Sequence, residues 1–150
     1  MQQKLFDDSK DRNKNQIQVY FDGLCQPCNP GGTACYAHTV KNGENTIHRK
    51  FGVAAYNSTN NVAVYTAIIR ALEWLLANNY QNEKIIVIGD YKLVIRQIER
   101  NSKVKAPNII PLYHNAMSLT SNSNIYNLNW YPENKTRRQI NYLIMRTQKL

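Results

Sequence analysis

Hydrophobic and polar residues alternate in the first part of the chain. In the run IQVYFDGL, Ile17, Val19 and Phe21 alternate with Gln18, Tyr20 and Asp22, a period of two that predicts a β-strand with one buried face. Two further strand-like runs follow, TACYAHTV and TIHRKFGVAAY. The Asn42-Gly43 pair between them is a strong signal for a tight hairpin turn. The pattern therefore predicts a three-stranded meander.

After the meander, the spacing of apolar residues becomes helical. Residues 57–60 are all suitable helix N-caps, and Val64, Ile68 and Leu72 then recur on one face until Asn78. This spacing predicts a helix that packs its apolar stripe on the meander.

The second half of the chain predicts a strand, two helices, a strand and a helix. The runs are, in order, KIIVIGD, YKLVIRQIER, a helix opened by Pro107, IYNLNWY, and a last helix from Asn134. In the helix opened by Pro107, the spacing predicts an inward face made of Ile110, Tyr113, His114, Met117 and Leu119. The order predicts an α/β fold, a mixed five-stranded sheet flanked by helices on both faces.

Length and charge narrow the class of protein. At 150 residues the chain has the size of one domain, with residues 1–16 predicted as a flexible polar tail and 17–150 as the folded part. No apolar run is long enough to span a membrane and no secretory signal is visible, so we expect a cytoplasmic protein. The net charge of +9 favours a polyanionic partner.

Three cysteines and a histidine form the pattern C-x₂-C-x₆-C-x₂-H, at Cys25, Cys28, Cys35 and His38. Such spacing suggests a zinc site, but Cys35 and His38 stand an odd number apart on one predicted strand and so point to opposite faces. A Cys25-Cys28 disulfide and two plain loop thiols both remain open. For His48 the sequence indicates no partner.

Several blocks occur together in a specific order: VYFDGLCQPCNPGG, STNNVAVY, IVIGDYKLVIRQI, KVKAPNIIPLY and LNWYPENK. They resemble the successive signatures of type 1 ribonuclease H, particularly its archaeal form, from about Ile17 to the C-terminal helix. The resemblance implies a ribonuclease H-like fold. It also implies cleavage of the RNA strand of an RNA/DNA hybrid by two divalent metals that four carboxylates hold.

Only half of that carboxylate set is present. The resemblance assigns the first carboxylate to Asp22 and the third to Asp90, whereas the second position is Val64 and the fourth is Arg138. Glu73 lies about 13 Å along the helix from Val64 and cannot replace it. Glu133 could contribute only through an unusual loop path.

Two interpretations of Asp22 and Asp90 compete. In the first, they are remnants that the Arg138 guanidinium bridges in place of metals, which leaves a net charge of about −1, and no cofactor is expected. In the second, the pair holds one weakly bound Mg²⁺ or Mn²⁺, enough for slow cleavage.

The resemblance also implies residues that contact nucleic acid. Thr59, Asn60 and Asn61 match a segment that faces the minor groove of the hybrid, where amides can read ribose 2′-hydroxyls. Helix capping by Thr59 or Asn60 is an equally good explanation for the first two. A basic group predicts phosphate contact: Lys103, Lys105, Lys135, Arg137 and Arg138.

Three functions follow as hypotheses. The first is a nucleic-acid-binding protein for RNA/DNA hybrid or structured RNA that lacks hydrolysis. The second is a metal-dependent hybrid endoribonuclease with a reduced site. The third is a structural subunit of a ribonucleoprotein assembly.

Overall fold

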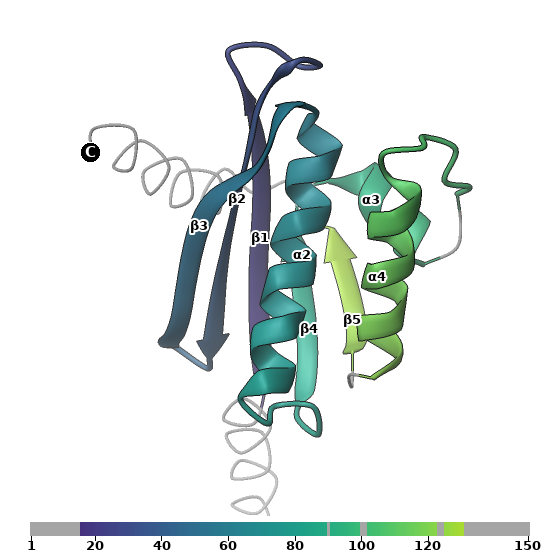
Figure 1. The fold of residues 1–150 in the computed structure, drawn as a ribbon. Coiled ribbons are helices and arrows are strands. Elements are labelled where there is room, and N and C mark those ends of the chain that lie inside the picture. Colours follow the sequence, from purple (N-terminus) through teal and green to yellow (C-terminus); the bar gives the residue numbers. More distant parts are fainter. Residues whose placement is uncertain (1–15, 90, 100–101, 123–124, 131–150) are drawn as a thin grey trace, which may run out of the picture.

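A five-stranded mixed sheet forms the centre of the protein, in the order β3-β2-β1-β4-β5 (Figure 1). The computed structural model describes residues 16–89, 91–99, 102–122 and 125–130. The strands are β1 (Gln16–Gln26), β2 (Gly32–Asn42), β3 (Asn45–Ser58), β4 (Lys84–Gly89) and β5 (Ile125–Trp130). The three N-terminal strands pair antiparallel, whereas β4 runs parallel to both β1 and β5.

The predicted alternation in β1 is confirmed. Ile17, Val19 and Phe21 are each 1% exposed, because their face of the strand is covered by a helix. The hairpin is also where the sequence predicts it, between the end of β2 and the start of β3. Gly43 has a φ of 62° there, a left-handed conformation that glycine adopts without strain.

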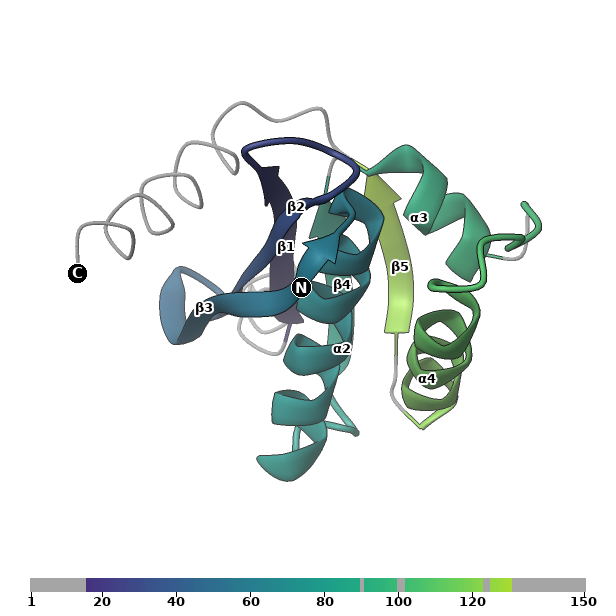
Figure 2. The same ribbon diagram turned by 45° about the horizontal axis from the view of Figure 1, so that its top comes forward.

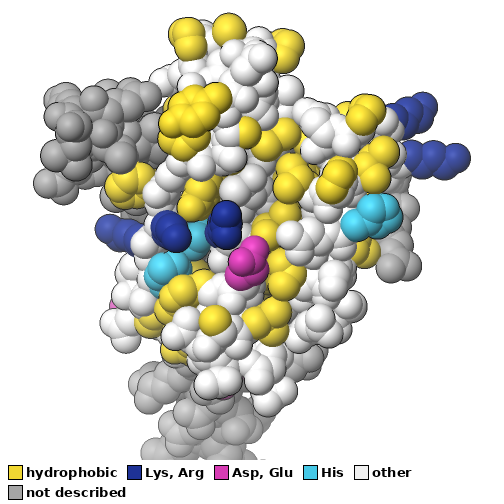
Figure 3. All heavy atoms as spheres, in the orientation of Figure 1, with side chains coloured by type: hydrophobic (Ala, Val, Ile, Leu, Met, Phe, Trp, Pro, Cys, Tyr) yellow, Lys and Arg dark blue, Asp and Glu magenta, His cyan; other side chains and the backbone are white. Residues whose placement is uncertain are grey.

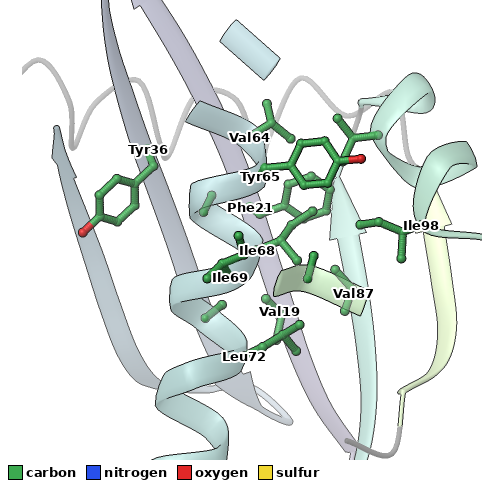
Figure 4. Close-up of a cluster of buried hydrophobic side chains, with 14 of the residues drawn as sticks. Val19, Phe21, Tyr36, Val64, Tyr65, Ile68, Ile69, Leu72, Val87 and Ile98 are labelled. Carbon is green, nitrogen blue, oxygen red and sulfur yellow. The ribbon is translucent and has the colours of Figure 1, made fainter. Parts of the chain in front are cut away.

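The helix α2 (Asn60–Ala77) lies across β1 and β2 and buries one long face against them (Figures 1 and 4). Two shorter helices follow, α3 (Lys92–Ile98) and α4 (Ile110–Ser121). Figures 1 and 2 show α4 on the same side of the sheet as α2, and the two helices are in contact. The last helix, predicted from Asn134, lies outside the described residues.

The predicted inward face of α4 is confirmed for Tyr113, Met117 and Leu119, which pack against the core, and is wrong for Ile110 and His114. The helix begins at Ile110, and the buried residues are Ile109, at 3% exposure, and Ala116, at 0%. Ile110 is 37% exposed and His114 is also exposed. Since consecutive helical residues are separated by about 100°, a stripe that starts at Ile109 turns Ile110 and His114 toward solvent.

The first strand begins at Gln16, a residue that the sequence assigns to the tail. Residues 1–15 lie outside the described residues, so the tail stays a prediction. Within the part of the chain that the structure describes, no helix has the length and apolar character needed to cross a membrane.

Five aromatic rings form a row from the sheet to α2. His38 on β2, which is 1% exposed, lies between Tyr36 and His48, with ring centroids 6.3 and 5.2 Å away. His48 stacks on Trp74 at 4.3 Å, and Trp74 stacks on Tyr80 at 5.7 Å. Both ring nitrogens of His38 are buried without a hydrogen-bond partner among the described residues.

The contact between Gly89 and Phe21 predicts a large effect of Gly89→Ala. A Cβ at Gly89 would lie 2.7 Å from Cε2 of Phe21 and closer still to other ring carbons. Because Phe21 is fully buried, the ring cannot move aside, and we expect a loss of about 3 kcal/mol in the free energy of unfolding. Urea denaturation measures this loss.

Gly52→Ala is the matched control. A Cβ at Gly52 would approach the ring of Tyr36 no closer than 3.2 Å, so its effect should be much smaller. Phe21→Leu combined with Gly89→Ala should recover part of the lost stability. Equal midpoints for Gly89→Ala and Gly52→Ala would contradict the prediction.

Candidate functional site

The site is built where β1 meets the start of α2. A Cβ on Gly23 would lie 2.6 Å from the backbone nitrogen of Val64 and 2.8 Å from its Cγ2 atom. Only glycine permits this approach, because real Cβ atoms do not come so close to other heavy atoms. The first turns of α2 are therefore docked directly against the residue that follows Asp22.

Asp22 is a buried carboxylate near the end of β1. It is 4% exposed, and its Oδ1 accepts a hydrogen bond of 2.8 Å from the backbone nitrogen of Gly23. Alternation along the strand places Asp22 on the face opposite to Phe21 and Gly23, both of which face α2. The backbone of the strand therefore fixes the first of the predicted site residues.

Val64 supplies no ligand atom to this site. It is 0% exposed and packs with Tyr65 and Phe21 in the core beneath α2 (Figure 4). Val64 also approaches Gly23 closely, and Gly23 directly follows Asp22 on β1. The position that the resemblance assigns to the second carboxylate therefore lies beside the first. Asp90 and Arg138, counted as the third and fourth positions, lie outside the described residues.

The described part of the site does not fit a pair of divalent cations. Mg²⁺ prefers several hard oxygen ligands, and here one carboxylate is accompanied by a buried valine. Among the residues that the structure describes, no three or more His, Cys, Asp or Glu side chains form a group that could hold a metal ion.

The loop between β1 and β2 holds the start of α2. Asn29 accepts a hydrogen bond of 3.0 Å at Oδ1 from the backbone nitrogen of Asn60. The Gly31 backbone nitrogen donates to the carbonyl of Ser58 at 2.7 Å, and the Cys25 thiol lies 3.5 Å from the same carbonyl oxygen. These contacts join two segments about 30 residues apart in the sequence.

The cysteines are free thiols in this structure. Cys25 is buried and donates to the carbonyl of Cys28 at 3.1 Å, whereas Cys28 is exposed. Of the two alternatives left open, the structure has free thiols rather than a disulfide, but Cys25 lies on β1 and only Cys28 lies in the loop. Cys35 pairs with Leu24 and His38 with Phe21, so the two side chains point to opposite faces, as the spacing predicts.

A pocket of about 250 Å³ opens beside these contacts. It is lined by residues 22–25 together with Asn29, Asn60 and Tyr91. Tyr91 reaches back from the start of α3 and donates a hydrogen bond of 2.6 Å from its hydroxyl to the carbonyl of Gly23. The Asn60 Nδ2 atom lies 3.5 Å from the same hydroxyl and donates to it.

Sequence reasoning missed two residues of this pocket. It assigns no functional role to Tyr91, whose ring packs against the core while the residue also lines the pocket. It assigns no role to Asn29. No local pattern could have found either one, since both act on residues at least 31 positions away in the sequence.

The segment 59–61, which the sequence predicts to contact nucleic acid, contains residues with different roles in the structure. Thr59 is the N-cap of α2, and its side chain accepts from the backbone nitrogen of Val62 at 3.3 Å. Asn60 lines the pocket, and Asn61 is partly exposed. Capping by Thr59 is thus confirmed, and it leaves the Asn60 side chain available for another role.

Part of the predicted basic group lies within the described residues. Lys103 and Lys105 are exposed in the segment between α3 and α4. Lys135, Arg137 and Arg138 lie outside the described residues. Figure 3 shows Lys and Arg side chains at both sides of the face that carries α2, with an acidic side chain near its centre.

Comparison with known proteins agrees with this fold. The N-terminal RNase H domain of Rv2228c from Mycobacterium tuberculosis, solved as a fusion with maltose binding protein, is 26% identical with a TM-score of 0.76. The match covers 89% of this chain and 96% of that one. The whole M. tuberculosis protein, the bifunctional protein Rv2228c, is 32% identical over 104 residues, which are 69% of this chain. The chain spans only 28% of the length of that relative.

Two further solved structures have the same fold. LC11-RNase H1 in complex with an RNA/DNA hybrid is 27% identical with a TM-score of 0.73, over 85% of this chain and 92% of that one. RNase H1 from the halophilic archaeon Halobacterium salinarum is 22% identical with a TM-score of 0.74, over 85% and 93% of the two chains.

The sequence also matches a family model, described as reverse transcriptase-like, over residues 22–138. This match begins at Asp22 and covers more than half of the 150 residues. The chain belongs to the reverse transcriptase-like family and has the fold of type 1 ribonuclease H.

Proposed function

We propose that the protein binds nucleic acid that contains an RNA strand, an RNA/DNA hybrid or structured RNA, and does not hydrolyse it. The observation that carries the proposal is Val64, which is fully buried against Gly23 where the family resemblance calls for a carboxylate. A valine at this position stabilises the core and cannot ligate a cation. The complex of LC11-RNase H1 with an RNA/DNA hybrid supports the ligand class.

Recognition without turnover needs two kinds of contact. The amides of Asn60 and Asn61 can both donate and accept hydrogen bonds, which suits them to ribose hydroxyls. Lys103, Lys105 and three cations outside the described residues, Lys135, Arg137 and Arg138, supply phosphate contacts. In this proposal Arg138 also offsets about half of the negative charge of Asp22 and Asp90.

The competing function is a metal-dependent hybrid endoribonuclease with a reduced site. The observation in its favour is the similarity of the chain to the N-terminal RNase H domain of Rv2228c from M. tuberculosis. In that case Asp22 and Asp90 would hold a single Mg²⁺ or Mn²⁺. A third possibility, a subunit of a ribonucleoprotein assembly, would be supported by RNA that copurifies in stoichiometric amount with partner chains.

Binding and cleavage of one labelled hybrid test the proposal. We expect binding that falls about 10²–10³-fold between 50 and 200 mM salt, because about five cations would displace counterions from phosphates. We expect no cleavage in Mg²⁺ or Mn²⁺. Fluorescence anisotropy measures the first and gel electrophoresis the second.

Lys103→Gln with Lys105→Gln is the matched variant for the charge contacts. It should lower the slope of log affinity against log salt by about 2. The exposed pair Lys84→Gln with Lys92→Gln, outside the predicted basic group, removes the same charge and serves as the control. Multiple-turnover cleavage by the parent would overturn the non-hydrolytic part of the proposal, and absence of binding would overturn the rest.

A further inference from the structure

We propose that Tyr91 is a positioning residue that fixes which atom of the Asn60 side-chain amide is available to a ligand. This inference rests on the proposed function, since it names how that site would select its ligand. It starts from two hydrogen bonds that meet at the Tyr91 hydroxyl.

The direction of the first hydrogen bond follows from chemistry alone. The carbonyl oxygen of Gly23 can only accept, so the Tyr91 hydroxyl must donate its one hydrogen to it, across 2.6 Å. Toward any other neighbour, the hydroxyl oxygen can then only accept.

The direction of the second hydrogen bond follows from the first. Asn60 faces the hydroxyl at 3.5 Å, and an oxygen that can only accept needs a donor there. The amide must therefore turn Nδ2 toward Tyr91. A side-chain amide can otherwise flip, with its oxygen and nitrogen exchanged.

The Oδ1 atom of Asn60 is consequently held on the other side of the amide. It is buried and has no hydrogen-bond partner among the described residues. The backbone of Asn60 is held as well, because its nitrogen donates to Asn29 at 3.0 Å. Both Asn60 and Asn29 line the pocket of about 250 Å³, so the residue that carries this buried acceptor stands at the pocket wall.

An unsatisfied buried acceptor favours a ligand that donates a hydrogen bond. A ribose carries a 2′-hydroxyl that can donate, and a deoxyribose has no such group. Tyr91 would thus raise the preference for a ribose-containing strand over an all-DNA duplex, without touching the ligand itself.

A double-mutant cycle tests this role. Tyr91→Phe removes the hydroxyl and keeps the ring, which frees the amide to flip. Affinities are measured for an RNA/DNA hybrid and for a DNA duplex of the same sequence at the same salt. We expect the hybrid preference of the parent to fall about 3–10-fold, the effect of one hydrogen bond, with the affinity for DNA unchanged.

The second variant of the cycle, Asn60→Ala, removes the acceptor and should cause a similar loss of preference. Because Tyr91 acts through Asn60, the double variant should lose no more than Asn60→Ala alone. Tyr113→Phe, which removes the hydroxyl of a partly buried tyrosine on α4, is the control and should leave the preference unchanged.

The outcomes separate the inference from the proposed function. If the parent prefers the hybrid and Tyr91→Phe keeps that preference, Tyr91 has no such role and the proposed function stands. The inference would also be overturned if Tyr91→Phe lowered the affinities for hybrid and for DNA equally. It would be overturned as well if the two single losses of hybrid preference added up in the double variant. If the parent does not bind the hybrid, the proposed function fails and the inference fails with it.

Discussion

Val64→Glu combined with Arg138→Asp is expected to create a metal site that the parent lacks. The two changes restore the carboxylates that the family resemblance places with Asp22 and Asp90. Val64→Glu alone should lower the free energy of unfolding by about 3 kcal/mol, because it buries a charge at a position that is 0% exposed. In the double variant, a bound cation would offset that charge.

The gain appears as metal-dependent stability. With a dissociation constant of about 0.1 mM, about 10 mM Mn²⁺ would add about 2.7 kcal/mol to the free energy of unfolding. Thermal unfolding with and without Mn²⁺, and calorimetric titration, measure the effect. The parent and both single variants serve as controls. If Mn²⁺ does not change the free energy of unfolding of the double variant, residues 64 and 138 are not the second and fourth carboxylate positions.

His38 should make the protein unstable in mild acid. Burial, reinforced by the nearby positive charges of His48 and Lys50, lowers the pKa of His38 from 6.5 to about 3. The unfolded chain therefore binds a proton below pH 6.5 that the folded chain does not bind until about pH 3. The stability is fully present above pH 6.5, and we expect about 2.5 kcal/mol to be lost between pH 7 and pH 4.5.

His38→Phe isolates this contribution from the carboxylates that titrate in the same range. Phenylalanine keeps an aromatic ring between Tyr36 and His48 and removes two nitrogens that have no partner among the described residues. At pH 7 the variant should be as stable as the parent or about 1 kcal/mol more stable. At pH 4.5 it should exceed the parent by about 2.5 kcal/mol or more.

Urea denaturation at the two pH values measures the difference. The control is His114→Gln, which changes an exposed histidine on α4 outside the row of aromatic rings and should keep the acid sensitivity of the parent. Identical profiles for the parent and His38→Phe would show that His38 does not carry the acid sensitivity.

The sequence predicts those parts of the fold that depend on local patterns. The alternation in β1, the turn at Gly43 and an N-cap within residues 57–60 each involve only a few neighbouring residues, and all three are confirmed, with Thr59 as the cap. The face of α4 is predicted less well, since it is set by a helix start three residues beyond Pro107.

Contacts between distant segments could not be read from the sequence. His48 shows no partner in the sequence, yet it stacks on Trp74 of α2. Tyr91 follows β4 and acts on Gly23 of β1, because parallel pairing brings the ends of these strands together. Register and helix packing decide such contacts, and neither leaves a signature in a short run of residues.

The attachment of the β1–β2 loop to α2 also affects how this site can evolve. The backbone of Asn60 depends on a side chain 31 positions earlier, at Asn29. An insertion or deletion between Cys28 and Gly32 would therefore displace the helix start, even though α2 itself was unaltered. The loop and the first turn of α2 are thus expected to diverge as a linked pair, each accepting only those changes that the other can accommodate.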